Sequence, residues 1–273
     1  MQTITQCKRP IVLFTISLLI AAGASMRCGS KSPLYWPPDG TVLLNQSWNV
    51  PLSDSSSVLQ KEGEVWILPA PPDTAVEKTY SRHLSARQVT HPDLFEHVDQ
   101  VVLHDNGTGM TEYYCFRRDG VFVLGYSRTA GDLHTRYNPP LLFLPNTLKN
   151  RHETLVHETT PTLYDAAADS TAAEQKMRIA LTLKERGVVR IENRTSPALW
   201  VRMRLSQDAV VAYGNDDLVL NDALMMQSDI LLVKDFGPIL EWGVRSKENE
   251  HPGNASEILT SDSFVQITLH QSF

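Results

Sequence analysis

The feature that most constrains this chain is a regular alternation of apolar and polar residues in its C-terminal part. Apolar residues occupy every second position in Lys176–Lys184 and Leu199–Leu205, and again at Val265, Ile267 and Leu269. Successive side chains of a strand point to opposite faces, so this pattern predicts strands with one buried and one solvated face. Burial of a single face is typical of antiparallel sheets and argues against an all-parallel sheet.

The same alternation predicts which side chains of Leu199–Leu205 are buried. We expect Val201, Met203 and Leu205 to face the core. Arg202 and Arg204 lie between them and should face solvent.

Residues 76–160 have the pattern of an antiparallel meander. Strands are predicted at Val98–Leu103, Thr111–Phe116 and Val121–Tyr126. The turn between the first two contains Asn106-Gly107, which accepts the positive φ angles of tight hairpins. Arg118–Gly120 is the next turn. Tyr137–Pro145 is an extended segment rich in proline, which we expect at a sheet edge or across a sheet end, because proline has no backbone donor.

The fold predicted from these patterns is mainly β: an antiparallel β-sandwich or a curved half-barrel sheet, with at most one or two short helices. The helical candidates are His83–Glu96, which Pro92 interrupts, and an alanine-rich stretch within residues 161–175. Residues 161–175 are expected to connect the meander of 76–160 to a second antiparallel half, 176–273, packed with the first as one domain.

A proline-rich N-terminal segment, residues 25–75, precedes the meander. Strands are expected at Thr41–Leu44 and Glu64–Leu68. Three aromatic residues of this segment are predicted to be packing anchors, with stacking against a ligand as the alternative role: Tyr35, Trp36 and Trp48.

Residues 1–24 resemble a secretory signal peptide. Lys8 and Arg9 precede the apolar run Ile11–Ala24, which ends in Ala22-Gly23-Ala24. The run is shorter than the roughly 20 residues of a membrane-spanning helix, although an uncleaved signal anchor is the alternative. The sequence therefore predicts an exported protein, periplasmic or anchored to the membrane of the cell envelope.

Two cysteines follow the predicted signal, and their roles depend on where it is cut. Cleavage before Cys28 would give a lipoprotein, with Gly29-Ser30 after the lipidated residue, although Arg27 departs from the usual lipobox. Cleavage after Ala24 would leave Cys28 and Cys115 able to form one disulfide. If Cys28 is lipidated, Cys115 is expected to be a small buried side chain in a strand.

Residues Tyr137–Leu148 carry a tyrosine, a Pro-Pro pair and an apolar run with Leu-Pro. Further matches are Glu112–Tyr114, Asp119–Val121 and Asp235–Ile239 before Trp242. In these features the chain is similar to a loose group of exported bacterial β-rich proteins, mostly lipoproteins or proteins of unknown function. The resemblance implies an antiparallel β-rich envelope protein and brings no catalytic residues.

Several function classes are disfavoured by the residues themselves. The formal charge is -6 without a basic patch, which argues against nucleic acid as a partner. His152 and His157 are five positions apart, whereas a zinc protease helix needs a spacing of four. No catalytic motif, metal site or cofactor site is predicted, and enzymatic activity is left open.

Three hypotheses of function are compatible with these residues. The first is a non-enzymatic envelope protein with a structural or binding role, in contact with the envelope membrane through Cys28. The second is a carrier that holds an apolar or lipid ligand in the cavity of a half-barrel. The third is a hydrolase whose site is assembled from residues distant in the sequence.

Overall fold

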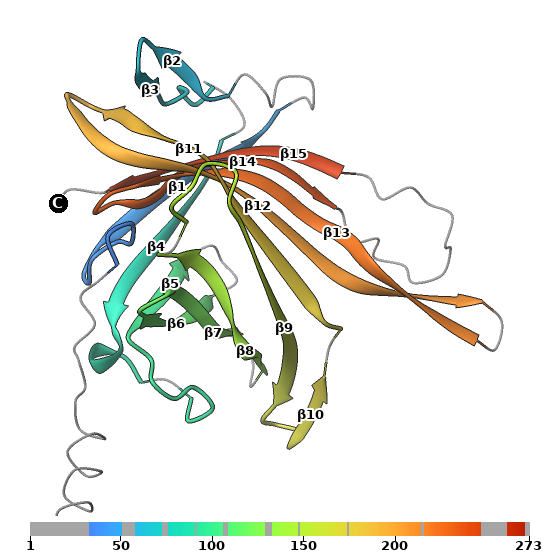
Figure 1. Cartoon of the computed structure of the whole chain (residues 1–273). Helices are drawn as coiled ribbons and strands as arrows, with labels where there is room; N and C mark the ends of the chain where they lie inside the picture. Colours follow the sequence, from blue (N-terminus) through green and yellow to red (C-terminus); the bar gives the residue numbers. More distant parts are fainter. Residues whose placement is uncertain are drawn as a thin grey trace, which may run out of the picture. The chain divides into compact units, whose positions relative to one another are not determined.

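A computed structural model of the chain describes residues 33–50, 58–72, 76–90, 92–105, 109–128, 133–146, 148–173, 175–213, 216–246 and 261–270 (Figure 1). The predicted signal peptide and Cys28 lie outside these residues. The strands are β1 (Val42–Asn49), β2 (Gln60–Glu62), β3 (Val65–Ile67), β4 (Glu77–Ser85), β5 (Gln100–Asp105), β6 (Met110–Arg117), β7 (Gly120–Arg128), β8 (Leu133–Pro145), β9 (Thr154–Asp165), β10 (Ser170–Ala173), β11 (Met177–Ile191), β12 (Arg194–Tyr213), β13 (Asp216–Val233), β14 (Gly237–Ser246) and β15 (Ser261–His270).

Two antiparallel meanders make up most of the sheet (Figure 1). Strands β4 to β9 pair in sequence order, and β11 to β15 do the same. Strand β1 pairs with both β4 and β15, and β9 pairs with β11, so each end of one meander is joined to the other. The result is a closed antiparallel barrel of 12 strands. The mainly β prediction is confirmed, but the sandwich and the half-barrel are wrong, because β1 and β9 bridge edges that would otherwise be open.

Closure on the β9 side depends on a change of neighbour within one strand. Asn138 of β8 pairs with Thr160 of β9 and is the last residue of that ladder. The next residue of β9, Thr159, pairs with Met177 of β11 instead. The second half of β9 thus pairs with β8 of the first meander, and its first half pairs with β11 of the second meander.

Two of the three prolines of Tyr137–Pro145, Pro139 and Pro140, lie at this change of neighbour rather than at a sheet edge, whereas Pro145 pairs with Gly120 of β7. Strand β8 has neighbours on both sides, but neither Pro139 nor Pro140 pairs in the β7 or β9 ladder. Side chains of β9 replace the lost backbone partners: Thr159 Oγ1 donates to Pro139 O at 2.5 Å, and His157 Nε2 donates to Pro140 O at 2.8 Å. The absence of ladder hydrogen bonds at Pro139 and Pro140 agrees with the prediction from proline's missing donor, but the predicted position at a sheet edge is wrong.

Both helical candidates differ from the sequence prediction, and no α-helix occurs among the described residues. His83–Glu96 contains the end of β4 and a single 3-10 turn, η2 (Ala86–Gln88). Residues 161–175 carry the end of β9, a turn and β10. Asp165 Oδ1 accepts the backbone N–H groups of Ala167 and Ala168, so a local turn takes the donors that a helix would have used.

The predicted register of β12 is confirmed. Val201 and Met203 are 2% and 4% exposed, and Leu205 is partly buried against the same core. Arg204 is exposed and Arg202 is partly exposed.

Two apolar clusters form the core, on opposite faces of the second meander. The first joins strands from both meanders across the interior of the ring; it includes Val101, Val121, Phe122, Ile179, Leu181, Leu183, Val201 and Ile230. The second covers the other face and includes Trp66, Val189, Leu231, Leu240, Trp242, Val265 and Ile267. The neighbours Ile230 and Leu231 belong to different clusters, so β13 is covered on both faces at this point.

Of the predicted aromatic anchors, Trp36 is 3% exposed, and Tyr35 and Trp48 are partly buried.

Candidate functional site

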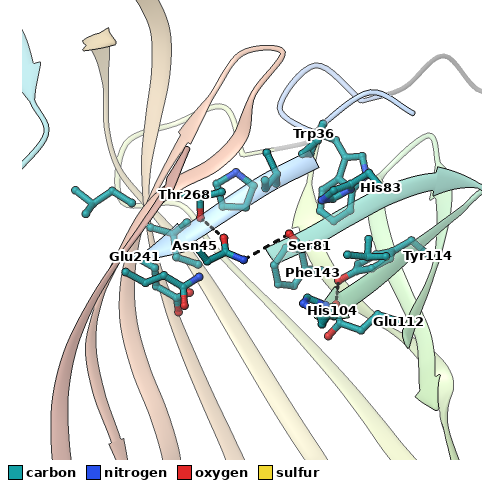
Figure 2. A pocket seen from close by; sticks show the side chains of 17 residues that line it. Trp36, Asn45, Ser81, His83, His104, Glu112, Tyr114, Phe143, Glu241 and Thr268 are labelled. Carbon is teal, nitrogen blue, oxygen red and sulfur yellow. Dashed lines mark hydrogen bonds and ion pairs between the residues drawn. The ribbon is translucent and has the colours of Figure 1, made fainter. Parts of the chain in front are cut away.

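The candidate site is a cavity of about 190 Å³ between strands on different sides of the ring (Figure 2). Its walls come from β1, β4, β5, β6, β8, β13, β14 and β15, and from the segment before β1. The lining residues are Trp36, Pro37, Leu43, Asn45, Ser81, His83, Val102, His104, Glu112, Tyr114, Phe143, Ile230, Pro238, Leu240, Glu241, Gln266 and Thr268.

Asn45 links three strands on one side of the cavity (Figure 2). Its Oδ1 accepts a hydrogen bond from Thr268 Oγ1 of β15 at 2.9 Å, and its Nδ2 reaches Ser81 Oγ of β4 at 3.5 Å. Asn45 and Thr268 lie opposite each other in the β1–β15 ladder. The polar row therefore follows directly from the strand pairing that closes the barrel.

Glu112 of β6 is the centre of a second polar group (Figure 2). His104 Nε2 lies 2.9 Å from Glu112 Oε2, and Tyr114 Oη donates to the same oxygen at 2.6 Å. Burial raises the pKa of Glu112, but the hydrogen bonds from His104 and Tyr114 and the nearby histidines outweigh burial and leave the pKa below its ordinary value. Burial, followed by the Glu112 charge, raises the pKa of Tyr114 well above its usual value, so this hydroxyl stays a donor.

A buried glutamine fixes the segment that closes one side of the cavity. Gln100 is fully buried, and its Oε1 accepts hydrogen bonds from Trp36 Nε1 at 2.5 Å and His83 Nδ1 at 2.9 Å. Its Nε2 donates to Pro37 O at 3.2 Å and Asp39 Oδ1 at 2.8 Å. These bonds use both donors and the acceptor oxygen of the amide, so Trp36 and Pro37 are held in place.

Three aromatic rings form an apolar wall of the cavity. The ring centroids of Trp36 and Tyr114 are 4.7 Å apart, and those of Trp36 and Phe143 are 5.9 Å apart. Tyr114 and Phe143 make an edge contact at 6.2 Å. The cavity thus combines an aromatic side with hydrogen-bonding groups, as small-molecule sites do.

Apart from the histidines, the ionisable side chains with a formal charge in the cavity wall are all acidic. Glu112 and Glu241 are among the lining residues, and none of those residues is a lysine or an arginine. His83 and His104 are the two histidines of the lining.

Of the residues singled out in the sequence, Trp36 lines the cavity, whereas the cysteine and the two histidines considered there lie away from it. Cys115 of β6 is a buried thiol in the core, and burial raises its pKa. Its proposed disulfide partner, Cys28, lies outside the described residues, so both roles of Cys28 stay predictions. His157 is in β9, where it serves Pro140, and His152 is in the turn before that strand. Among the described residues, no group of three or more His, Cys, Asp or Glu side chains is placed to hold a metal ion.

His104 and Glu112 were not identified from the sequence, although a signal for them existed. They flank the predicted Asn-Gly turn, and the β5–β6 ladder pairs Val102 with Glu112. Because positions two apart on a strand share a face, Val102 and His104 lie on the same side of the sheet as Glu112. The predicted hairpin placed the two strands side by side, but its first strand ended at Leu103, so only the structure places His104 in β5 beside Glu112 and both of them in a cavity.

Comparison of the chain with protein-family models, with curated proteins and with solved structures finds no match. The similarity to exported β-rich proteins therefore stays a prediction. No helix in the described part of the chain is long and apolar enough to span a membrane.

Proposed function

We propose that this protein is an exported envelope protein whose barrel binds a small ligand in its interior. The observation that carries the proposal is the cavity of about 190 Å³, walled by side chains from both meanders. Pockets for drug-sized ligands are larger, about 300–1,000 Å³, so the ligand would be small. Export rests on the predicted signal in residues 1–24, and contact with the envelope membrane rests on Cys28.

The composition of the wall favours a polar or amphipathic ligand over a lipid. Asn45, Ser81 and Thr268 line one side, and Glu112 with His104 lines another. These groups already bond to one another, but a lipid tail could not use the hydrogen-bonding capacity that remains, such as the second oxygen of the Glu112 carboxylate, and burying an unused polar group costs about 1–3 kcal/mol.

One observation favours a second candidate, an enzyme. His104 and Glu112 form a hydrogen-bonded pair in the cavity wall, and such a pair can act as a general base. Ser81 is the serine of the same wall, and its Oγ is in contact with Asn45 Nδ2. In this candidate a water molecule would be the nucleophile.

The test is a fragment screen by nuclear magnetic resonance on the purified mature chain. We expect small polar fragments to shift resonances of Asn45, His104 and Thr268. Thr268→Met should fill the cavity and abolish these shifts, whereas Thr154→Met, at an exposed position of β9, should preserve them. Shifts that persist in Thr268→Met, or that map to another surface, would reject the cavity as the binding site. Turnover of ester or amide fragments that Glu112→Gln abolishes would establish the enzyme instead.

A further inference from the structure

The cavity contains a carboxylate oxygen that the described protein leaves without a hydrogen bond. Both bonds to Glu112, from His104 and from Tyr114, end on Oε2, and Oε1 accepts none from the described residues. The Glu112 side chain is 24% exposed and lines the cavity. A ligand in the cavity can therefore reach a carboxylate that its neighbours already hold in one orientation.

The charge of the wall determines which ligands would gain from this contact. The lining has carboxylates but no lysine or arginine, so an anionic ligand would face repulsion there. A cation would be attracted, and more strongly than in water, because the wall is partly apolar. Glu241 is the second carboxylate of the lining.

The aromatic wall favours an organic cation over an inorganic one. Trp36, Tyr114 and Phe143 present π-systems, which attract alkylammonium groups at distances up to about 6 Å from a ring centroid. A calcium ion instead needs about six to eight oxygen ligands in direct contact. Asn45, Gln266 and Thr268, on the polar side, offer groups that could bind a hydroxyl or amide of the ligand.

We propose that the cavity binds a small alkylammonium cation, with the charged nitrogen between Glu112 and the aromatic wall formed by Trp36, Tyr114 and Phe143. This inference rests on the proposed function and specifies its ligand class. The hydroxyl or other polar end of the ligand points toward Asn45 and Thr268.

The experiment compares two probes of the same shape by isothermal titration calorimetry on the mature chain. Choline carries the charge, and 3,3-dimethylbutan-1-ol is its neutral isostere. Choline should bind at least about tenfold more tightly than the alcohol, because cation–π and charge interactions are strong in a desolvated site.

Two variants separate the charge from the aromatic contribution. Glu112→Gln keeps the shape and hydrogen-bonding oxygen of the side chain, and it should weaken choline binding about tenfold while leaving the alcohol unchanged within about twofold. Phe143→Leu keeps an apolar side chain without the ring and should also weaken choline selectively. Thermal melts of each variant establish that it is folded, and the second variant keeps the test valid if the first does not fold.

Three other results of these titrations would contradict the proposal. Equal binding of the two probes, abolished by Thr268→Met, would reject the cation and retain the small-ligand function. Displacement of choline by tighter-binding calcium chloride would overturn the organic cation in favour of an inorganic one. Failure of both probes would reject the alkylammonium proposal, and the fragment spectra of Thr268→Met would then decide the proposed function separately.

Discussion

The indole ring of Trp66 lies directly over Gly187, where an added Cβ would come within 3.1 Å of the ring. Trp66 is 1% exposed and belongs to the short β2–β3 hairpin. Strand β3 of this hairpin pairs with β11 in parallel orientation. Because Gly187 has no side chain, the Trp66 ring can pack directly on the β11 backbone, and the hairpin thereby covers this part of the second meander.

The Trp66 contact predicts that Gly187→Val weakens the hairpin. The added isopropyl group would force the ring from its site, and overpacking of this kind costs about 1–3 kcal/mol. Chemical denaturation followed by tryptophan fluorescence measures this change. Glu64→Ala, at an exposed position of the same hairpin, should stay within about 0.5 kcal/mol of the unsubstituted chain. A Gly187→Val variant as stable as Glu64→Ala would show that Trp66 moves without penalty.

The two arginines of β12 should differ in their effect on stability, contrary to the simple expectation that both face solvent alike. Arg202 holds Asp229 with two hydrogen bonds, Nε to Oδ1 at 3.1 Å and Nη2 to Oδ2 at 2.8 Å. Trp200 Nε1 donates to the same carboxylate at 2.8 Å. Arg202→Asp would place a second carboxylate beside Asp229 and should cost about 2 kcal/mol. Arg204→Asp should change stability by no more than about 0.5 kcal/mol, and thermal melts in which the two variants agree would contradict the pairing.

Glu112 predicts a pH-dependent contribution to stability. Its pKa is lowered in the folded protein relative to the ordinary value of 4.5, so its ionised form stabilises the fold above that value. The contribution is lost as the pH falls through the lowered pKa. The melting temperature of the unsubstituted chain should therefore exceed that of Glu112→Gln at pH 7, and the difference should shrink below about pH 4.5.

The matched control for this pH series is Glu96→Gln, at an exposed position. It should melt like the unsubstituted chain at every pH. A Glu112→Gln difference that is constant from pH 7 to pH 3 would mean that packing, rather than charge, accounts for it.

Cys28 provides the test of membrane attachment. If the chain is lipidated, Cys28→Ser should abolish labelling by a radioactive fatty acid and release the protein from the membrane fraction. If Cys28 instead pairs with Cys115, the mature chain should be soluble, start near Ser25 and show a disulfide in its peptide map. Mass spectrometry of the envelope fraction distinguishes these results, and a chain that retains Met1 in the cytoplasm would reject export.

The sequence was informative about the candidate site only in part. It predicted the hairpin that brings His104 and Glu112 to one face, because the Asn-Gly turn and the strand alternation are local signals. The partners across the cavity were not predictable in this way. Asn45 and Thr268 bond to each other across 223 positions of the chain, and neither residue lies in a motif.

The alternation of apolar residues by itself determined parts of β11, β12 and β15, their antiparallel arrangement and the buried face of β12, whereas β13 and β14 were not predicted from it. These properties depend on the two-residue period of a strand, which every short segment carries on its own. Only the tertiary structure decided that the sheet closes, that the Pro-Pro of β8 lies at a change of strand neighbours, and that a cavity remains inside. The physical reason is that closure depends on the pairing of β1 with β15 and of β9 with β11. Alternation specifies which face of a strand is buried but not which distant strand lies beside it.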